Sequence, residues 1–263
     1  MASPVGRPPA TAPPTANRRE PLAAGYFCQP RNLRGTNMDE AEQEQAKRRA
    51  GKSAADAVSS GAVVGLGTGS TAAHAIDRLG ERVAGGLDLR GVPTSYQARR
   101  RAQTAGIPLT TLAEHTPEVA IDGADQVAND ALLKGGGAAH VREKVVAAAA
   151  DRLIIVVDPS KLREQLAGRV PVAVMPAARH LVADAVSAND GEPTLRQAAH
   201  KDGPVVTDDG ALVLDCVFDP IHDPGALATD LDTIPGVIGH GLFVGLADEI
   251  HVGTPTDLRV RKP

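Results

Sequence analysis

The chain is poor in aromatic residues and in cysteine. Tryptophan is absent, and Phe, Trp and Tyr together make up 2% of the 263 residues, so a core must be built from Ala, Val, Leu and Ile. The two cysteines, Cys28 and Cys216, lie far apart in dissimilar surroundings. This excludes a disulfide framework and a cysteine-based metal cluster, and it is typical of a protein from a reducing cytoplasm.

A long apolar run and a strong net charge are also missing. No stretch of 18 apolar residues occurs, so the sequence predicts no membrane-spanning helix. The net charge is −4, which argues against nucleic acid as the main partner. Hydrophobic residues make up 42% of the chain, enough for the core of one large domain or two small ones.

Residues 1–37 are rich in Pro, Ala and Thr and show no periodicity. This composition predicts a disordered extension, with the folded part starting near Met38. The segment has no apolar core of the kind found in secretory signals, so secretion is not expected.

The stretch GAVVGLGTGST (61–71) organises the rest of the chain. A short apolar run at 62–66 predicts a buried strand, alternate glycines predict a tight turn, and Ser70 and Thr71 open an amphipathic helix. Helix N-termini present unpaired N–H groups that bind anions, and glycine lets a ligand approach the backbone closely. We therefore expect either a phosphate or carboxylate site here or a purely structural turn.

Two better-known phosphate motifs do not fit this stretch. The dinucleotide fingerprint G-x-G-x-x-G fails because Ser70 stands where the third glycine belongs, and the P-loop fails because no Gly-Lys-Ser/Thr follows.

Asp122 and Asp125 follow a second short apolar run, Val119–Ile121. Ligands of open α/β sheets bind at the carboxyl ends of strands, so these carboxylates are candidates for acid/base work or hydroxyl binding. An Asx-rich turn is the commoner outcome for such a pattern.

The sequence KGGG (134–137) precedes a strong helical pattern that contains Glu143. Ordering three consecutive glycines costs conformational entropy. Such a run is expected where backbone N–H groups must approach an oxyanion closely. Lys134 adds a positive charge there. Glu143 is predicted either to face this loop or to be a solvated helical charge, the usual fate of glutamate.

The remaining pattern predicts a parallel sheet followed by a smaller unit. Further strands are expected at 87–92, 107–112 and 153–157, with Lys161 beyond the last of them. From 168 to 235 the chain changes to short strands and turns, which predicts a second, α+β domain. The last strands, at 241–244 and 249–252, are expected to return to the first sheet.

The carboxyl ends of parallel strands meet at one edge of a sheet. The two glycine loops, two aspartates, Glu143 and two lysines should therefore share one crevice. That set suits a small, anionic, hydroxyl-bearing substrate and proton transfer by a carboxylate base with oxyanion stabilisers.

Together these stretches resemble type A ribose-5-phosphate isomerase over roughly residues 40–255. The motifs that carry the resemblance are GLGTGSTA, GVPTSYQA, IDGADQV, KGGGAAHVREK, VDPSKL, VTDDGALVLDC and IPGVIGHGLFVG. The family interconverts D-ribose 5-phosphate and D-ribulose 5-phosphate through an enediolate in the pentose phosphate pathway. The resemblance implies a homodimer or homotetramer that needs no metal or other cofactor, and the cysteine pattern predicts a cytoplasmic location.

The fold implied by the resemblance is α/β: a Rossmann-like large domain (38–167 and 236–263) with a parallel-rich sheet, plus the small α+β domain (168–235). The implied roles are base for Glu143, oxyanion stabilisation for Lys134, and hydroxyl proton transfer with ring opening for Asp122. The implied substrate-binding residues are Lys47, Thr68, Gly69, Ser70, Thr71, Asp122, Gly123, Ala124, Asp125, Lys134, Gly135, Gly136, Gly137 and Lys161, of which Thr68–Thr71, Lys161 and Lys47 are assigned to the phosphate.

Gln126 and His140 depart from the family pattern, since an acidic and an aliphatic residue are common at these places. Three rival hypotheses remain: an amino-sugar phosphate deaminase or CoA transferase on the same scaffold, a non-catalytic sugar-phosphate sensor, and a dinucleotide-binding protein. The intact spacing from KGGG to Glu143 favours the isomerase, the lack of a helix-turn-helix in the first 60 residues argues against the sensor, and Ser70 argues against the dinucleotide-binding protein.

Overall fold

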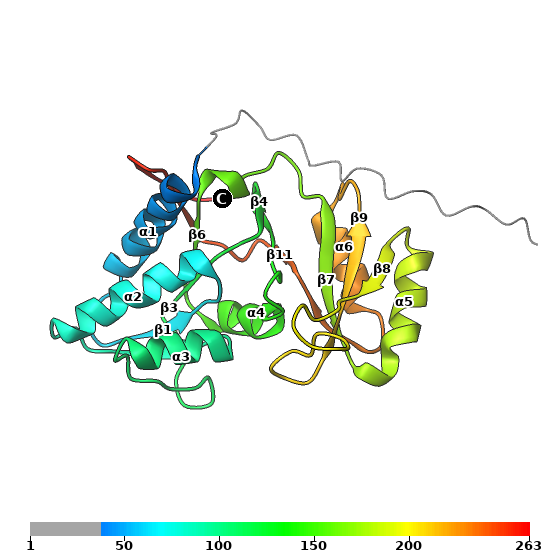
Figure 1. Ribbon diagram of the computed structural model, residues 1–263, viewed down its shortest axis with the longest axis horizontal. Helices are drawn as coiled ribbons and strands as arrows, with labels where there is room; N and C mark the ends of the chain where they lie inside the picture. The colour runs from blue at the N-terminus through cyan, green and yellow to red at the C-terminus, as the bar shows by residue number, and fades with distance from the viewer. Residues whose placement is uncertain (1–37) are drawn as a thin grey trace, which may run out of the picture. The chain divides into compact units, whose positions relative to one another are not determined.

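The computed structural model describes residues 38–263, and the disorder expected for residues 1–37 lies outside this part of the chain (Figure 1). A six-stranded sheet has the order β13-β12-β6-β3-β1-β2. Its strands are β1 (Ala62–Leu66), β2 (Leu89–Pro93), β3 (Val119–Asp122), β6 (Leu153–Val157), β12 (Glu249–Gly253) and β13 (Leu258–Arg261). All neighbours are parallel except β12 and β13, which confirms the α/β class with a parallel-rich sheet.

The centre of this sheet is apolar on both faces. Every residue of β1, β3 and β6 is buried, as expected for continuous aliphatic runs in a parallel sheet. The strand expected at 107–112 does not form, and Leu109 makes only an isolated bridge to Gly91. Pro108 at this place has no N–H to donate to a strand ladder.

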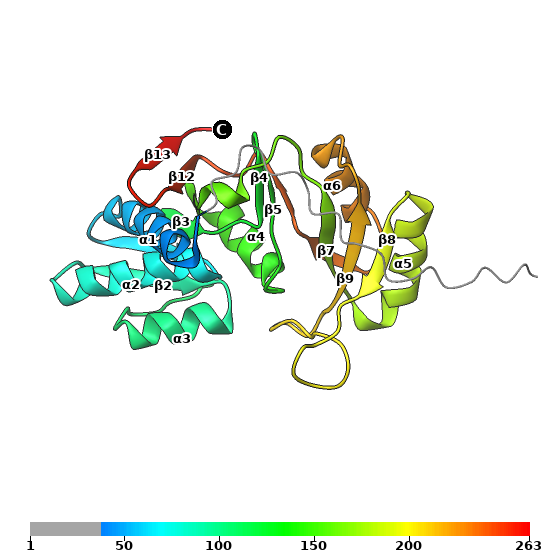
Figure 2. The same ribbon diagram turned by 45° about the horizontal axis from the view of Figure 1, so that its top comes forward.

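Four helices cover the two faces of the sheet (Figure 2). They are α1 (Glu40–Asp56), α2 (Ser70–Ala84), α3 (Tyr96–Thr104) and α4 (His140–Ala149). The first three pack on one face against Val64, Leu66 and Ile154. Val146 and Ala147 of α4 pack on the other face. Within residues 38–263, no helix is long and apolar enough to cross a membrane.

A three-stranded antiparallel sheet, in the order β11-β5-β4, lies beside α4 (Figure 1). Its strands are β4 (Gln126–Ala128), β5 (Ala131–Leu133) and β11 (Leu242–Val244). The expectation that 241–244 returns to the first sheet is therefore wrong, because Leu242 pairs with Leu133 instead. The strand expected at 249–252 does return, as β12 beside β6.

A four-stranded antiparallel sheet, in the order β10-β7-β9-β8, follows β6 in the chain. Its strands are β7 (Gly168–Val174), β8 (Glu192–Leu195), β9 (Leu212–Phe218) and β10 (Val237–His240), and it carries α5 (Arg179–Ala188) and α6 (Pro224–Asp232). Two short 3-10 helices, η1 (Pro159–Lys161) and η2 (Pro176–Ala178), precede and follow β7. The sheet runs to His240, while the domain boundaries at 168 and 235 stay a prediction.

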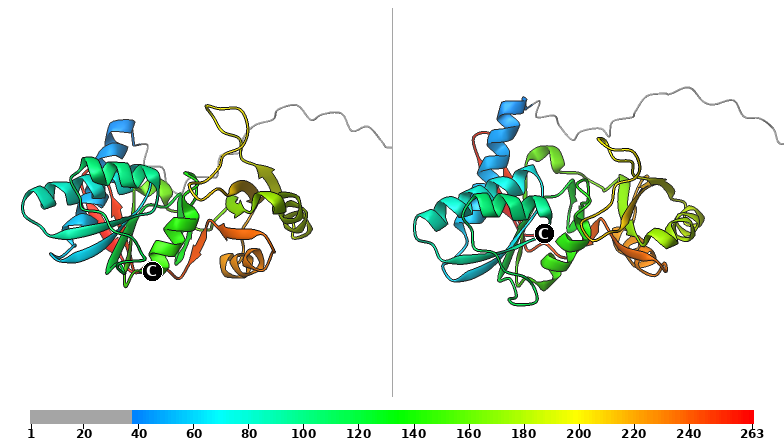
Figure 3. Two further views of the ribbon diagram at one scale, coloured as in Figure 1. Left: turned by 90° about the horizontal axis from the view of Figure 1, so that it is seen from below. Right: turned by 60° about the horizontal axis from the view of Figure 1, so that its bottom comes forward.

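The loop from β8 to β9 (yellow in Figure 3) extends away from this sheet. It contacts α3 and α4, two of the helices that pack on the six-stranded sheet. Asp208 accepts a hydrogen bond from the backbone N–H of Tyr96, at the start of α3, at 2.7 Å. Asp209 pairs with Arg142 of α4, whose Nε donates at 2.8 Å. The adjacent residues Asp208 and Asp209 thus tie the β8–β9 loop to α3 and α4.

Candidate active site

The predicted loops converge on one cavity of about 150 Å³. It is lined by Thr68, Gly69, Ser70, Thr71, Gln97, Gly123, Ala124, Asp125, Lys134, Gly135, Gly136, Gly137, Glu143 and Lys161. Asp122 lies directly behind this lining, in contact with Lys134. Lys47 is half-buried on α1 and does not line the cavity.

The first glycine loop ends at the N-terminus of α2. Gly69 is the N-cap residue with φ of 112°, a conformation that suits glycine, and no side chain caps the helix. Ser70 is therefore the first helical residue and does not cap α2, so the first N–H groups of the helix are left for a ligand. The Thr68 hydroxyl donates to the Ser95 hydroxyl at 2.7 Å, which fixes this loop against α3.

Asp122 is the last residue of β3, and its side chain is turned into the protein with 3% of its surface exposed. Its Oδ1 atom accepts hydrogen bonds from the backbone N–H groups of Thr68 at 3.1 Å and Gly123 at 2.7 Å. A Cβ on Gly67 would lie 2.2 Å from this same oxygen. The Asp122 carboxylate can therefore approach this loop only because residue 67 is glycine and has no Cβ.

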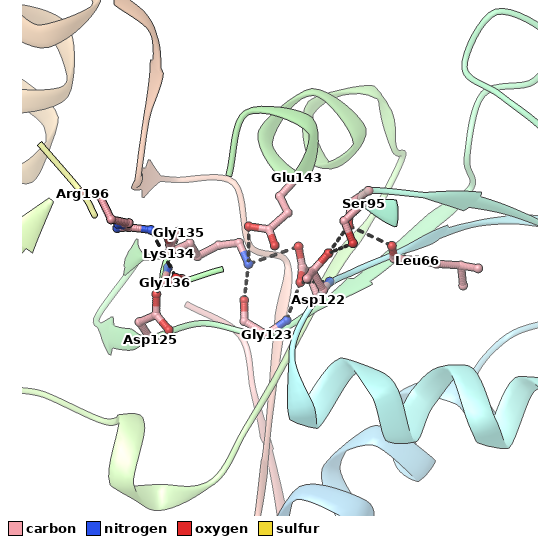
Figure 4. A network of polar contacts seen from close by, with 12 residues as sticks. Leu66, Ser95, Asp122, Gly123, Asp125, Lys134, Gly135, Gly136, Glu143 and Arg196 are labelled. Atoms are coloured by element: carbon pink, nitrogen blue, oxygen red, sulfur yellow. Dashed lines mark hydrogen bonds and ion pairs between the residues drawn. The ribbon is translucent and has the colours of Figure 1, made fainter. Parts of the chain in front are cut away.

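Lys134 lies between two buried carboxylates (Figure 4). Its Nζ atom is 3.1 Å from Asp122 Oδ2 and 3.2 Å from Glu143 Oε2, and it also donates to the carbonyl of Gly123. The ammonium is 5.5 Å from the centre of the Phe243 ring, within the range of a cation–π contact. Burial alone would lower the pKa of Lys134, but the two carboxylates together raise it, so the side chain is charged.

Glu143 is in the first turn of α4, and its surface is 5% exposed. Burial, together with the charge of Asp122, raises the pKa of Glu143 to about 8, although Lys134 opposes this rise. Burial also raises the pKa of Asp122. Because Asp122 accepts two backbone hydrogen bonds besides its contact with Lys134, Glu143 is the carboxylate that takes up a proton first.

The second glycine loop has a constrained backbone. Asp125 accepts a hydrogen bond from the N–H of Gly136 at 2.9 Å. Gly135 has φ of 105°, and Ala138, just before α4, has φ of 60°. A non-glycine residue in this region is uncommon and stores strain. The turn between the triple glycine and Glu143 is therefore held by its surroundings.

Lys161 lines the same cavity from η1. The preceding turn is fixed by buried Asp158, which accepts from the N–H of Ser160 at 2.8 Å. Gln43 of α1 donates to the Ser160 hydroxyl at 3.3 Å. The backbone that carries Lys161 is thus held in place beside the cavity.

The structure accommodates the two residues that depart from the family pattern in different ways. Gln126 donates to the carbonyl of Ala167 at 2.8 Å and accepts from its N–H at 3.1 Å, which a carboxylate cannot do. His140 is fully buried beside Gly135, and its ring nitrogens have no hydrogen-bond partner in the described part of the chain. Burial lowers the pKa of His140 to about 3, so it packs there as a neutral ring.

Gln97 lines the cavity and was not among the predicted residues. It follows Ser95, which caps α3 by accepting from the N–H of Ala98 at 3.1 Å. The motif PTSYQA predicts this cap and helix, but it gives no reason for the second helical residue to face a ligand.

Within residues 38–263, no group of three or more His, Cys, Asp or Glu side chains is arranged to hold a metal ion. The groups that the cavity does offer are two buried carboxylates, a buried ammonium, backbone N–H groups and hydroxyls. These can move protons and stabilise a developing oxyanion.

Comparisons with known proteins agree with this chemistry. The family model for ribose 5-phosphate isomerase A (phosphoriboisomerase A) matches residues 90–257. Ribose-5-phosphate isomerase A of Natronomonas pharaonis is 63% identical over 218 residues, which cover 83% of this chain and 97% of that protein. The same enzyme of Haloarcula marismortui is 58% identical over 224 residues, or 85% and 98% of the two chains.

Two solved structures are also similar. Ribose 5-phosphate isomerase A of Methanocaldococcus jannaschii has a TM-score of 0.80 and 39% identity, covering 82% of this chain and 98% of that chain. A D-ribose-5-phosphate isomerase in complex with phospho-erythronic acid has a TM-score of 0.82 and 39% identity, covering 86% and 100%.

Proposed function

Since the chain belongs to the ribose 5-phosphate isomerase A family, we propose that Glu143, Lys134 and Asp122 carry out its proton transfers. The enzyme interconverts D-ribose 5-phosphate and D-ribulose 5-phosphate. The contact of one buried ammonium with two buried carboxylates, at 3.1 and 3.2 Å, is the observation that best supports these roles.

In the proposed mechanism, Glu143 acts as the base. In the open-chain aldose it removes the proton from C2, and the electrons move into a C1–C2 double bond, which gives the enediolate. Glu143 then delivers a proton to C1 to form the ketose. Lys134 and those N–H groups of the triple-glycine loop that Asp125 does not bind stabilise the negative charge on oxygen. Asp122 moves the hydroxyl proton and assists in opening the sugar ring.

The phosphate is assigned to the opposite end of the cavity. The free N–H groups at the start of α2, the hydroxyls of Thr68, Ser70 and Thr71, and the Lys161 ammonium together suit a dianion. Lys47 is proposed for a weaker, more distant contact with the phosphate.

Assaying the isomerisation of D-ribose 5-phosphate in the presence of EDTA tests the reaction and its independence from metal. Full turnover in EDTA is expected. Turnover on glucosamine 6-phosphate or coenzyme A would favour a different enzyme on this scaffold. Binding of the sugar phosphate without turnover would favour a sensor.

The raised pKa of Glu143 predicts a pH dependence. A base must be ionised to act, so kcat/KM is expected to fall as the pH drops through about 8. The substrate phosphate titrates near ~6 and gives a separate step. Profiles measured over about pH 4 to 10 check this. A fall only near the ordinary glutamate value of 4.5 would contradict the assignment.

Lys144 is a necessary control for this profile. Lys144 follows Glu143 in the chain, and burial lowers the pKa of Lys144 to about 8. The two groups therefore titrate in the same pH range. Lys144→Met should leave the fall near pH 8 in place if Glu143 causes it. If the step disappears in this variant, the titration belongs to the lysine.

Lys161→Ala is expected to raise KM by at least about tenfold and to change kcat little, since one charge-assisted hydrogen bond contributes ~1.5–3 kcal/mol. Steady-state kinetics on D-ribose 5-phosphate measure both constants. Exposed Lys52 on α1 provides the matched control, and Lys47→Ala tests the weaker contact. An unchanged KM in Lys161→Ala would remove this residue from the phosphate site.

We also propose a homodimer or homotetramer that works in the cytoplasm. The oligomer follows from membership of the family, and the cytoplasmic location follows from the cysteine pattern. Light scattering of the purified protein would give the number of chains in the particle.

A further inference from the structure

Arg196 reaches from the four-stranded sheet to the triple-glycine loop. It follows β8, and its Nη1 atom donates to the carbonyl of Gly135 at 2.8 Å and to that of Gly136 at 3.2 Å. Figure 4 shows the guanidinium on one side of this loop and Lys134 with Glu143 on the other. One side chain of the second sheet thus holds two successive peptide groups of the active site.

The guanidinium itself is held by Asp215 of β9. Nε donates to Asp215 Oδ2 at 2.9 Å and Nη2 donates to Oδ1 at 2.5 Å, a two-bond geometry that fixes the plane of the guanidinium. The side chains of Arg196 and Asp215 are 16% and 14% exposed. The backbone N–H of Arg196 also donates to Val213 on β9. The donor therefore has little freedom to turn away from the loop.

Holding a carbonyl also orients an N–H group. In a trans peptide the C=O of one residue and the N–H of the next point in opposite directions. The N–H of Gly136 shares a peptide with the Gly135 carbonyl, and the N–H of Gly137 shares one with the Gly136 carbonyl. With both carbonyls turned toward Arg196, both N–H groups point away from it. The N–H of Gly136 is taken by Asp125, while Gly137 lines the cavity.

We propose that Arg196, held by Asp215, is a positioning residue for the isomerisation. It turns the Gly137 N–H into the cavity for the enediolate oxygen, and its charge polarises the peptide so that this N–H donates more strongly. This inference rests on the proposed role of the triple-glycine loop in oxyanion stabilisation. The new element is a residue outside that loop that orients the peptide groups of the loop.

Behind the loop is a second cavity, of about 430 Å³, which makes the proposal testable by chemical rescue. Its lining includes Arg196, Asp215, Gly136 and Asp125. When the Arg196 side chain is shortened to alanine, a free guanidinium ion can enter this space. There it can bridge Asp215 and the two carbonyls as the side chain does.

The experiment compares Arg196→Ala with the unchanged protein in kcat, in KM and in inhibition by phospho-erythronic acid, whose carboxylate carries its charge on two oxygens as an enediolate does. We expect kcat to fall at least ~10-fold, as for loss of an oriented oxyanion donor, with KM changed less than about threefold. The inhibition constant should rise in proportion to the loss of kcat. Guanidinium ion, well below denaturing concentrations, should restore part of kcat.

Matched variants separate positioning from folding. Arg101→Ala removes a similar two-bond pair, with Asp77 on α2, that contacts no catalytic loop, so its kcat should be unchanged. Asp215→Asn keeps Arg196 but weakens the two hydrogen bonds that hold its guanidinium. It should therefore lower kcat, as Arg196→Ala does. If Arg196→Ala fails to fold, Arg196→Lys replaces it, because it keeps the charge but loses the two-bond geometry.

The outcomes distinguish this inference from the proposed function. If the unchanged protein turns over and Glu143→Gln does not, but Arg196→Ala keeps its kcat, the inference about Arg196 is wrong and the function stands. Equal losses in kcat and stability without guanidinium rescue would also overturn it, since they indicate a structural role alone. An unchanged protein without turnover would instead refute the proposed function.

Discussion

Glu143→Gln is expected to keep the fold and the binding of D-ribose 5-phosphate while losing at least ~10²-fold in turnover, the lower end for a general base. The amide has almost the same shape as the carboxylate but cannot accept the C2 proton. The buried site also loses a negative charge beside Asp122, so the folded state should not be destabilised by charge repulsion. Turnover and substrate binding, measured separately, check the two halves of this prediction.

Hydrogen exchange gives a sharper measurement for Glu143. In the unchanged enzyme, some of the hydrogen removed from C2 should exchange with solvent before it returns to C1. Glu143→Gln should lose this exchange together with turnover. Glu118→Gln, at an exposed position just before β3, serves as the control and should retain both. Near-normal turnover in Glu143→Gln would remove this residue from the mechanism.

Lys134→Met is expected to lower turnover by ~10²–10³-fold, because it removes the charge that faces the developing oxyanion. Methionine fills a similar volume, so the loss would reflect charge more than packing. With the ammonium gone, the pKa of Asp122 and that of Glu143 should rise further, and the fall of kcat/KM should move to higher pH. Breaking a buried ion pair from one side also costs ~3–5 kcal/mol of stability unless the carboxylates take up protons.

Lys144→Met is the matched control for this substitution. Lys144 is also buried in part, and its Nζ atom lies 5.1 Å from the centre of the same Phe243 ring. Its contact in the described part of the chain is with His240, at 3.3 Å, and not with Asp122 or Glu143. Turnover should therefore stay close to that of the unchanged protein. Comparable losses in both lysine variants would mean that the effect comes from packing around Phe243.

The central parts of the fold and of the site could be predicted because their signals are local. Aliphatic runs gave the strands at 62–66 and 153–157, and glycine loops after strands marked where polar groups gather. The failures depend on tertiary contacts. A strand at 242–244 is recognisable, but its choice of β5 over the main sheet is set by pairing across more than a hundred residues.

The same reasoning explains why some groups near the site were missed. Gln97 faces the cavity because of the direction in which α3 leaves Ser95, which no local pattern encodes. Arg196 reaches Gly135 across 61 positions of the chain, and its sequence context resembles any charged residue at the end of a strand. The burial of Glu143 was open on the sequence alone, since most helical glutamates are solvated.

The attachment of the β8–β9 loop to α3 has a practical consequence for experiments. The chain has no tryptophan and two tyrosines. One of them, Tyr96, is 64% exposed, while its backbone N–H is bound to Asp208 and its neighbour Gln97 lines the cavity. With no indole to mask it, tyrosine emission can be followed in the unlabelled protein. The native fluorescence thus carries a reporter at the junction between the catalytic cavity and the second sheet.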